Sequence, residues 1–203
     1  MKINYQIMLD STLAQIQELA YVPKLLLHSC CAPCSTYVLE YLSKYFDITV
    51  YYYNPNIFPQ EEFDFRLQEQ IRLANDMHAA RPVSVVGCNW SSDEFYAVVA
   101  GLESEPEGGK RCEECFRLRL GKTAEYAADN GFDYFTTTLS ISPHKNAQLL
   151  NALGEEIAGQ YGIKYLHSDF KKNNGYKRSC ELSADFGLYR QDYCGCVYSK
   201  TNR

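Results

Sequence analysis

The sequence predicts an α/β protein with a doubly wound, parallel β-sheet. Strand-like and helix-like segments alternate along most of its 203 residues, a pattern typical of right-handed β-α-β connections. The apolar run Leu25-Leu26-Leu27 is too continuous for a strand with one face in water, so it indicates a strand buried on both faces. The turn residues Asn54-Pro55-Asn56 directly follow the next strand-like segment, so polar groups are expected at the carboxyl end of that strand.

Local signals place each segment in turn. The segment 48–53 is β-branched and aromatic, as strands are, and Gly131 stands where a long charged helix should stop. Strands are predicted at 24–29, 48–53, 83–86, 132–138 and 163–167. Helices are predicted at 11–21, 35–45, 60–79, 92–101, 112–130, 144–160 and 181–189.

The length suits a single domain, 1–203, that can bury a sizeable core. The polar tail 169–203 is expected to form a C-terminal flap that returns over the sheet. The N-terminus has no secretory pattern, and no segment approaches the ~18 uninterrupted apolar residues of a spanning helix. We therefore expect a soluble, cytoplasmic protein with no membrane partner.

The net charge of −5 provides no general attraction to nucleic acid, yet the C-terminal segment is locally basic. Taken singly, each of these basic residues is most often a solvated surface residue. Together they are a candidate contact with RNA, and some of the 17 tyrosines are candidates for stacking on a base. The basic residues are Lys171, Lys172, Lys177, Arg178, Arg190, Lys200 and Arg203.

Nine cysteines carry the strongest functional signal, and seven of them fall into three tight groups. Structural disulfides are rare in the cytoplasm and an odd count argues against full pairing, so metal ligation or a catalytic dithiol is favoured. The first group follows a buried strand, where open α/β sheets bind ligands. The groups are Cys30-Cys31-Ala32-Pro33-Cys34, Cys112-Glu113-Glu114-Cys115 and Cys194-Gly195-Cys196.

The first two groups provide four thiols, the usual number for an iron–sulfur cluster or a structural zinc: Cys30, Cys31, Cys112 and Cys115. A Cys-x-x-Cys pair at a helix start is a good metal corner, because the helix N-terminus stabilises thiolates. Neighbouring Cys30 and Cys31 point in different directions from an extended backbone, which suits a cluster better than one tetrahedral ion. Zinc is therefore the less favoured alternative.

The third group, Cys194-Gly195-Cys196, has a central glycine that permits the tight backbone needed for a disulfide across one residue. Such a bond is strained and easily reduced, so we interpret the pair as a reversible electron store. In the alternative interpretation both cysteines are metal ligands, with Cys34 as a candidate ligand of a second iron. Cys88 and Cys180 stand alone and are expected to be small apolar residues.

Other candidate site residues follow the fourth predicted strand. The hydroxyls and amides of residues 136–145 suit an anion, although helix capping by Ser142 ahead of Pro143 explains part of this pattern without a ligand. His144 is either a general acid or a surface residue. Arg117 and Arg119 are two positions apart and cannot share one helix face, so one is expected to face the site and the other solvent.

Five ordered motifs resemble the epoxyqueuosine reductases of the QueH family, which are cobalamin-independent enzymes of tRNA modification, and they span nearly the whole chain. The motifs are His28-Ser29-Cys30-Cys31-Ala32-Pro33-Cys34-Ser35, Tyr53-Asn54-Pro55-Asn56-Ile57, Arg111-Cys112-Glu113-Glu114-Cys115-Phe116-Arg117-Leu118-Arg119-Leu120, Thr137-Thr138-Leu139-Ser140-Ile141-Ser142-Pro143-His144-Lys145-Asn146, and Gly187-Leu188-Tyr189-Arg190-Gln191-Asp192-Tyr193-Cys194-Gly195-Cys196-Val197-Tyr198-Ser199.

The resemblance implies a Rossmann-like fold of the adenine-nucleotide α-hydrolase kind, a 4Fe-4S cluster and an additional mononuclear iron. It implies that Cys30, Cys31, Cys112 and Cys115 hold the cluster, and that Cys194 and Cys196 form a redox-active disulfide. The implied reaction is the last step of queuosine biosynthesis, in which epoxyqueuosine at the tRNA wobble position loses its epoxide oxygen as water. An external electron donor is then required.

The expected substrate contacts are Tyr53, Arg117, Ser142, His144, Tyr189 and Arg190, with His144 also a candidate proton donor. ATP use is not expected, because Pro33 removes an amide from the position of a phosphate-binding loop. Two other functions compete with the reductase: a zinc-containing RNA-binding module without catalysis, and an ATP-dependent sulfurtransferase on the same fold.

Overall fold

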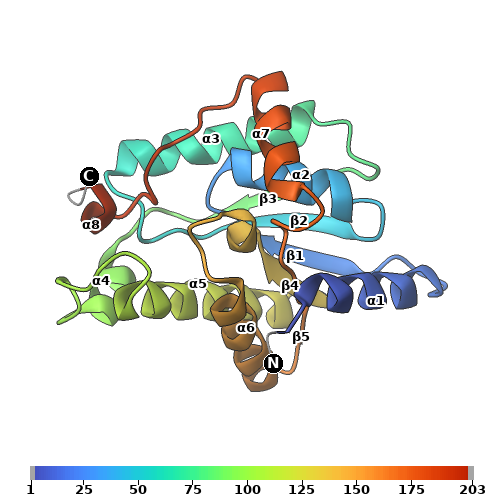
Figure 1. The fold of residues 1–203 in the computed structure, drawn as a ribbon, viewed down its shortest axis with the longest axis horizontal. Helices are drawn as coiled ribbons and strands as arrows, with labels where there is room; N and C mark the ends of the chain where they lie inside the picture. The colour runs from blue at the N-terminus through green and yellow to red at the C-terminus, as the bar shows by residue number, and fades with distance from the viewer. Residues whose placement is uncertain (1–2, 201–203) are drawn as a thin grey trace.

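Five parallel strands form the sheet at the centre of the structure, a computed structural model that describes residues 3–200 (Figure 1). The strands lie in the order β3-β2-β1-β4-β5, so the chain builds one half of the sheet outward from β1 and then returns to build the other half from β4. This order places a topological switch point between β1 and β4. The predicted α/β class with a parallel, doubly wound sheet is confirmed.

The elements follow one another as the sequence alternation predicts, with one short 3₁₀ turn, η1, after β4. The strands are β1 Lys24–His28, β2 Asp47–Tyr52, β3 Ser84–Gly87, β4 Tyr134–Thr137 and β5 Lys164–Tyr165. The helices are α1 Tyr5–Gln17, α2 Ala32–Leu42, α3 Gln60–Asp76, α4 Asp93–Val99, α5 Lys110–Asp129, η1 Thr138–Ile141, α6 Ala147–Tyr161, α7 Gly175–Asp185 and α8 Val197–Lys200.

Two apolar cores cover the two faces of the sheet. Side chains of α1 and α2 pack on one face around Leu25 and Leu27, and side chains of α5 and α6 pack on the other face around Leu26. Figure 1 shows α2, α3 and α7 above the sheet and α4, α5 and α6 below it. The three leucines of β1 are fully buried, as their continuous apolar run predicts.

Two helix boundaries differ from the sequence prediction because other residues cap them. Asn4 accepts a hydrogen bond from the Gln6 amide at 3.1 Å, so α1 begins before residue 11. Asn146 accepts from the amides of Gln148 and Leu149, so α6 begins at Ala147 and Ser142 is not its N-cap.

The described part of the predicted flap, residues 169–200, first packs α7 against α2 and then follows α3. Arg72 of α3 donates to the Phe186 carbonyl at 3.1 Å, and Glu69 accepts from the Tyr189 amide at 3.2 Å. The chain ends in α8 near α4 (Figure 1), where the Tyr198 and Phe95 rings are 6.4 Å apart. Helix α7 ends before Gly187, whose φ of +56° favours glycine. Residues 201–203, including Arg203, lie outside the described residues.

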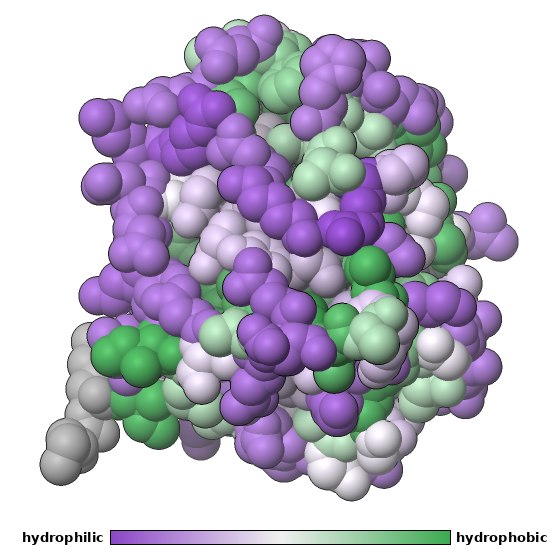
Figure 2. All heavy atoms as spheres, turned by 90° about the vertical axis from the view of Figure 1, so that its right-hand side faces the viewer, coloured by the Kyte–Doolittle hydropathy of each residue, from purple (hydrophilic) through white to green (hydrophobic). Residues whose placement is uncertain are grey.

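No helix among the described residues is long and apolar enough to cross a membrane. Figure 2 shows hydrophilic side chains over much of the face that it presents, with hydrophobic side chains in smaller patches between them.

Candidate redox and metal site

Three thiols gather where the chain leaves β1 at the switch point of the sheet. The sulfur atoms of Cys30, Cys31 and Cys34 all lie within 4.8 Å of one another, and the Cys30 and Cys31 sulfurs are 3.8 Å apart. Cys31 precedes α2 and Cys34 lies in its first turn, so the partial positive charge of the helix N-terminus favours thiolates here. The structure therefore places Cys34 beside the two cysteines predicted to bind metal.

A buried polar network fixes this turn. The hydroxyls of Ser29 and Ser35 are 2.6 Å apart, and both donate to the side-chain oxygen of Gln70 at 2.9 and 2.8 Å. Asn54 donates to the Ser29 carbonyl at 2.8 Å, which ties the turn after β2 to the turn after β1. These hydrogen bonds hold the turn that carries the cysteines, although the Gln70 side-chain nitrogen is buried without a partner.

The second pair of cysteines lies in the first turns of α5, as the Cys-x-x-Cys pattern predicts. The Cys112 sulfur accepts a hydrogen bond from the Gly108 amide at 3.2 Å, and Cys115 packs in an apolar cluster that includes Cys196. Cys30 packs against the apolar cluster that contains Cys112. Cysteines from three distant segments thus lie at one end of the sheet, and among the described residues only the Cys30, Cys31 and Cys34 sulfurs form a group within 4.8 Å.

Several contacts hold the Cys194-Gly195-Cys196 turn. The Phe58 amide donates to the Gly195 carbonyl at 3.0 Å, and buried Arg66 donates to the Cys194 carbonyl at 3.4 Å. Gly195 has a φ of +110°, and a Cβ there would lie 3.0 Å from Ile57 and 3.1 Å from Arg66. Only glycine suits this position.

A fully buried arginine lies beneath the cysteines and joins two strand ends. Arg119 donates to Asn54 at 2.8 Å, to the His28 Nε2 at 3.3 Å and to the Cys115 sulfur at 3.9 Å. Nε2 of His28 also lies 3.2 Å from the Tyr53 carbonyl oxygen, and Nδ1 lies 2.9 Å from the Thr137 hydroxyl, so both ring nitrogens have polar partners. Burial and the neighbouring Arg119 lower the pKa of His28 to about 3, so this histidine is neutral and structural.

The three clustered thiols differ in acidity. Hydrogen bonds from the Cys31 and Cys34 thiols, together with the positive charge of Arg119, hold the pKa of Cys30 well below its usual range. The hydrogen bond to Cys30 raises the pKa of Cys31 to about 12, and hydrogen bonds to Cys30 and Cys31 raise the pKa of Cys34 well above its usual range. Cys30 is therefore the thiol of this group that most readily carries negative charge and meets an incoming metal ion.

A pocket of about 340 Å³ opens over this group and brings the first and third cysteine groups together. Its wall combines thiols with polar and aromatic side chains from the β4–α6 loop, α7 and the C-terminal segment. The lining residues are Cys30, Pro33, Cys34, Glu107, Leu139, Ile141, Ser142, Pro143, His144, Lys145, Tyr176, Ser179, Arg190, Gln191, Asp192, Tyr193 and Cys194.

Three of the six predicted substrate contacts line this pocket: Ser142, His144 and Arg190. The other three lie outside its lining. Tyr53 donates to Glu94, Arg117 forms ion pairs with Glu156 at 2.6 Å and Glu113 at 3.9 Å, and Tyr189 packs its ring against Phe65 at 5.2 Å. Of the two α5 arginines predicted to face different ways, Arg119 faces the cysteines and Arg117 is 36% exposed.

Three further residues of the site were not singled out as site residues from the sequence. These are Arg66 and Arg119, which are buried beside the cysteines, and Lys145, whose Nζ is 3.3 Å from the Cys194 sulfur. The sequence indicated that either Arg117 or Arg119 faces the site. Lys145 directly follows His144, the residue of the fourth motif that was singled out. Arg119 differs from Arg117, and Lys145 from His144, mainly in the direction in which the side chain points. A single sequence carries little information about that direction.

Thiols from three segments, buried basic side chains and a pocket at the switch point of a parallel sheet define a protein of metal- or thiol-dependent redox chemistry. The family described as "Epoxyqueuosine reductase QueH" matches the chain over residues 25–202. The chain belongs to this family of oxidoreductases, as its five motifs predict.

Relatives that carry the same description match most of the chain. The protein of Streptococcus pyogenes serotype M1 is 46% identical over 200 residues, which cover 98% of this chain and 78% of that protein. The protein of Staphylococcus epidermidis is 46% identical over 98% of this chain and 85% of its own length. The protein of Thermotoga maritima is 35% identical over 88% of this chain and 91% of its own length.

Proposed function

We propose that this chain reduces epoxyqueuosine to queuosine at the wobble position of tRNA. The observation that carries the proposal is the convergence of Cys30, Cys34 and Cys194 on one pocket, in a chain that belongs to the epoxyqueuosine reductase family. Removal of the epoxide oxygen as water needs two electrons and two protons, and thiols beside a pocket are suited to supply both.

The thiols fit an iron–sulfur cluster. Soft sulfur donors close to two helix N-termini are the ligands that such clusters use, and the Cys30, Cys31 and Cys34 sulfurs lie within 4.8 Å of one another, so that two of the proposed cluster ligands adjoin the proposed ligand of the additional iron. We assign Cys30, Cys31, Cys112 and Cys115 to a 4Fe-4S cluster and Cys34 to an additional iron. When bound, these groups would supply single-electron transfer and Lewis acidity.

The Cys194 and Cys196 pair would store two electrons as a dithiol and release them as a disulfide. Gly195 allows the tight turn that this bond needs, and Cys194 faces the pocket. An external donor would restore the dithiol. Because the dithiol and the external donor supply the electrons, electron transfer needs neither ATP nor cobalamin. We propose that the enzyme uses neither.

The substrate nucleoside would enter the pocket between the β4–α6 loop and α7. Ser142, His144 and Arg190 line it and would contact the modified base, while the exposed rings of Tyr189 and Tyr176 suit stacking of unpaired loop bases. Tyr53 and Arg117 would contact tRNA only outside the pocket. A tRNA substrate also implies a cytoplasmic location.

Some basic residues of the flap bind partners within the protein, and others are exposed to solvent. Lys171 donates to the Ser140 carbonyl at 2.8 Å, and Arg178 binds Glu40 at 2.6 Å, so both have internal partners. Lys172 and Lys177 are exposed and remain the better candidates for contact with tRNA phosphates.

The test is anaerobic purification with iron reconstitution, followed by a reductant-driven assay on tRNA that carries epoxyqueuosine. Queuosine is measured by mass spectrometry, and metal and sulfide are quantified in parallel. Formation of queuosine with about four or five irons per chain supports the proposal. Bound zinc without iron or product would instead favour an RNA-binding module without catalysis.

A further inference from the structure

A lysine side chain contacts the Cys194 thiol in the wall of the pocket. Lys145 Nζ is 3.3 Å from the Cys194 sulfur, and only 9% of the Lys145 side chain is exposed. An ammonium group with so little access to water needs compensating negative charge. Glu107 is 3.5 Å away but is 36% exposed, and the Phe116 ring lies 5.7 Å from Nζ.

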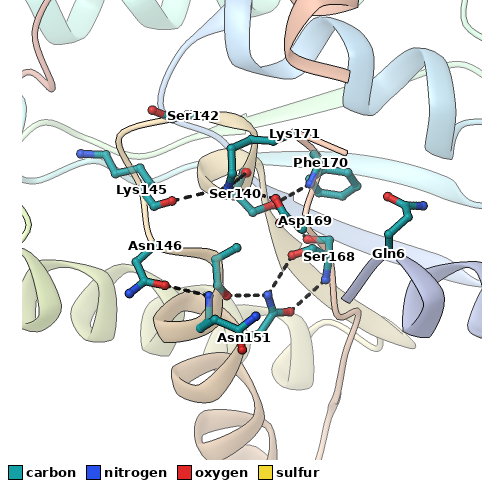
Figure 3. Close-up of polar contacts among 12 residues, drawn as sticks. Gln6, Ser140, Ser142, Lys145, Asn146, Asn151, Ser168, Asp169, Phe170 and Lys171 are labelled. Atoms are coloured by element: carbon teal, nitrogen blue, oxygen red, sulfur yellow. Dashed lines mark hydrogen bonds and ion pairs between the residues drawn. The ribbon is translucent and has the colours of Figure 1, made fainter. Parts of the chain in front are cut away.

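The loop that carries Lys145 is fixed from its opposite side. Lys171 Nζ donates to the carbonyl of Ser140 at 2.8 Å and to the carbonyl of Lys145 at 3.5 Å. Asn151 binds both the amide and the carbonyl of Ser168, at 2.9 and 2.8 Å. Figure 3 shows the Lys145 side chain pointing away from this network while its carbonyl faces Lys171. The backbone of Lys145 is therefore held from the side opposite to its ammonium group.

The groups that face Nζ favour its charged form. The Cys194 sulfur at 3.3 Å and the Glu107 carboxylate at 3.5 Å are the groups in reach of Nζ whose negative charge would stabilise the ammonium group. The neighbouring His144, the proton donor expected from the sequence, is an exposed residue of the pocket rim. Lys145 is the cation that touches a reacting sulfur.

We propose that Lys145 is a catalytic residue that pairs its ammonium group with the Cys194 thiolate in the reduced enzyme and gives a proton to the departing oxygen when Cys194 and Cys196 form their disulfide. This inference rests on the proposed epoxide reduction. Oxidation of the pair removes the negative charge that holds the proton on Lys145, so electron release and proton release are linked.

The atoms and charges of this step balance. The epoxide takes up two electrons and two protons, its two C–O bonds break, and an alkene and water form. The Cys194 thiolate and the Cys196 thiol become a disulfide and release two electrons and one proton. Lys145 supplies the second proton and becomes a neutral amine. An external two-electron donor and two solvent protons then restore the thiolate, the thiol and the ammonium group.

The pairing of Lys145 with the Cys194 thiolate is tested by the rate of Cys194 alkylation, which is measured without enzymatic turnover. Anaerobically purified holoenzyme is treated with iodoacetamide at about pH 7, and carboxamidomethylation of Cys194 is followed by peptide mass spectrometry. Lys145→Met should slow this modification about tenfold because the thiolate is the reactive form, and Lys145→Arg should stay within about twofold of the wild type. Lys164→Met, on the exposed strand β5, is the matched control and should not change the rate. An unchanged rate in Lys145→Met would overturn the pairing.

Proton donation is tested by turnover of the same variants. Arginine keeps the positive charge but does not release a proton, so Lys145→Arg should lower kcat about 100-fold while KM for tRNA and iron content stay near wild type. Wild-type turnover in Lys145→Arg would overturn the donor role. If the wild type forms no queuosine, both the proposed function and the role of Lys145 as proton donor are wrong. The ratio of Cys194 alkylation rates between wild type and Lys145→Met would still show whether Lys145 pairs with the Cys194 thiolate.

Discussion

The Cys30–Cys34 turn and the Cys194–Cys196 turn face the same pocket, but they are held in different ways. The first follows a fully buried central strand and is fixed by the Ser29, Ser35 and Gln70 network. The second belongs to a segment that reaches the site along α3 and is held by Phe58 and Arg66. A turn built into the sheet suits a permanent ligand, whereas a turn on a segment outside the sheet suits a group that changes its bonding in each cycle.

The strongest test of this contrast is Cys30→Ser. It removes the thiol with the lowest pKa of its group, so we expect loss of most bound iron and activity below about 1% of wild type. Iron and sulfide per chain and queuosine formation measure the effect. Cys180→Ser on α7, outside the pocket lining, is the control and should retain both. Full iron content in Cys30→Ser would remove this cysteine from the proposed ligands.

Cys194→Ser should separate the two turns. We expect about 100-fold lower turnover with the iron content of the wild type, because this turn stores electrons in the proposal and does not hold the metal. Cys196→Ser should behave in the same way. Loss of iron in either variant would favour the alternative in which Cys194 and Cys196 are metal ligands.

Arg119→Met tests whether the first turn depends on the charge buried beneath it. The change leaves the buried Asn54 oxygen and His28 Nε2 without their donor, so the free energy of unfolding should fall by about 2 kcal/mol. Urea denaturation measures the loss. Arg117→Met, on the exposed side of the same helix, should change it by less than about 0.5 kcal/mol. Equal effects would mean that the buried network contributes little.

Gly195→Ala probes the second turn through its backbone. The positive φ and the close approach of Ile57 and Arg66 should cost about 1–2 kcal/mol and increase hydrogen exchange in residues 190–200. Gly121→Ala is the matched control, since Gly121 lies within α5 with nothing within 4 Å of its added Cβ. That variant should be stabilised by about 0.5–1 kcal/mol. A Gly195→Ala protein with unchanged exchange would contradict the strained turn.

The smallest effect is expected from two exposed lysines, Lys172 before α7 and Lys177 within it. Lys172→Gln with Lys177→Gln should weaken tRNA binding a few-fold and reduce the slope of log affinity against log salt by about one to two. Fluorescence anisotropy over a series of salt concentrations measures both quantities. If affinity and slope are unchanged, tRNA approaches the pocket from another side.

The elements of the sheet could be predicted because each has a strong local signal. The apolar run of β1 and the cysteines in the first turns of α5 were placed correctly from their own residues. The start of α6 was wrong because Ser142-Pro143 and Asn146 both carry capping signals, and the 3₁₀ turn after β4 makes Asn146 the N-cap. Helix α7 was predicted at 181–189 but spans Gly175–Asp185, where it packs on α2.

By itself, the sequence determined the fold class, the family and the three groups of cysteines, because these depend on residue type and on spacing along the chain. Only the tertiary structure decided that Cys34 joins Cys30 and Cys31, that Arg119 faces the thiols while Arg117 faces solvent, and that Lys145 meets Cys194 across 49 positions of sequence. The physical reason is that a side chain's partners depend on the rotation of its helix, the path of its loop and the burial around it. Those properties arise only when distant segments pack together.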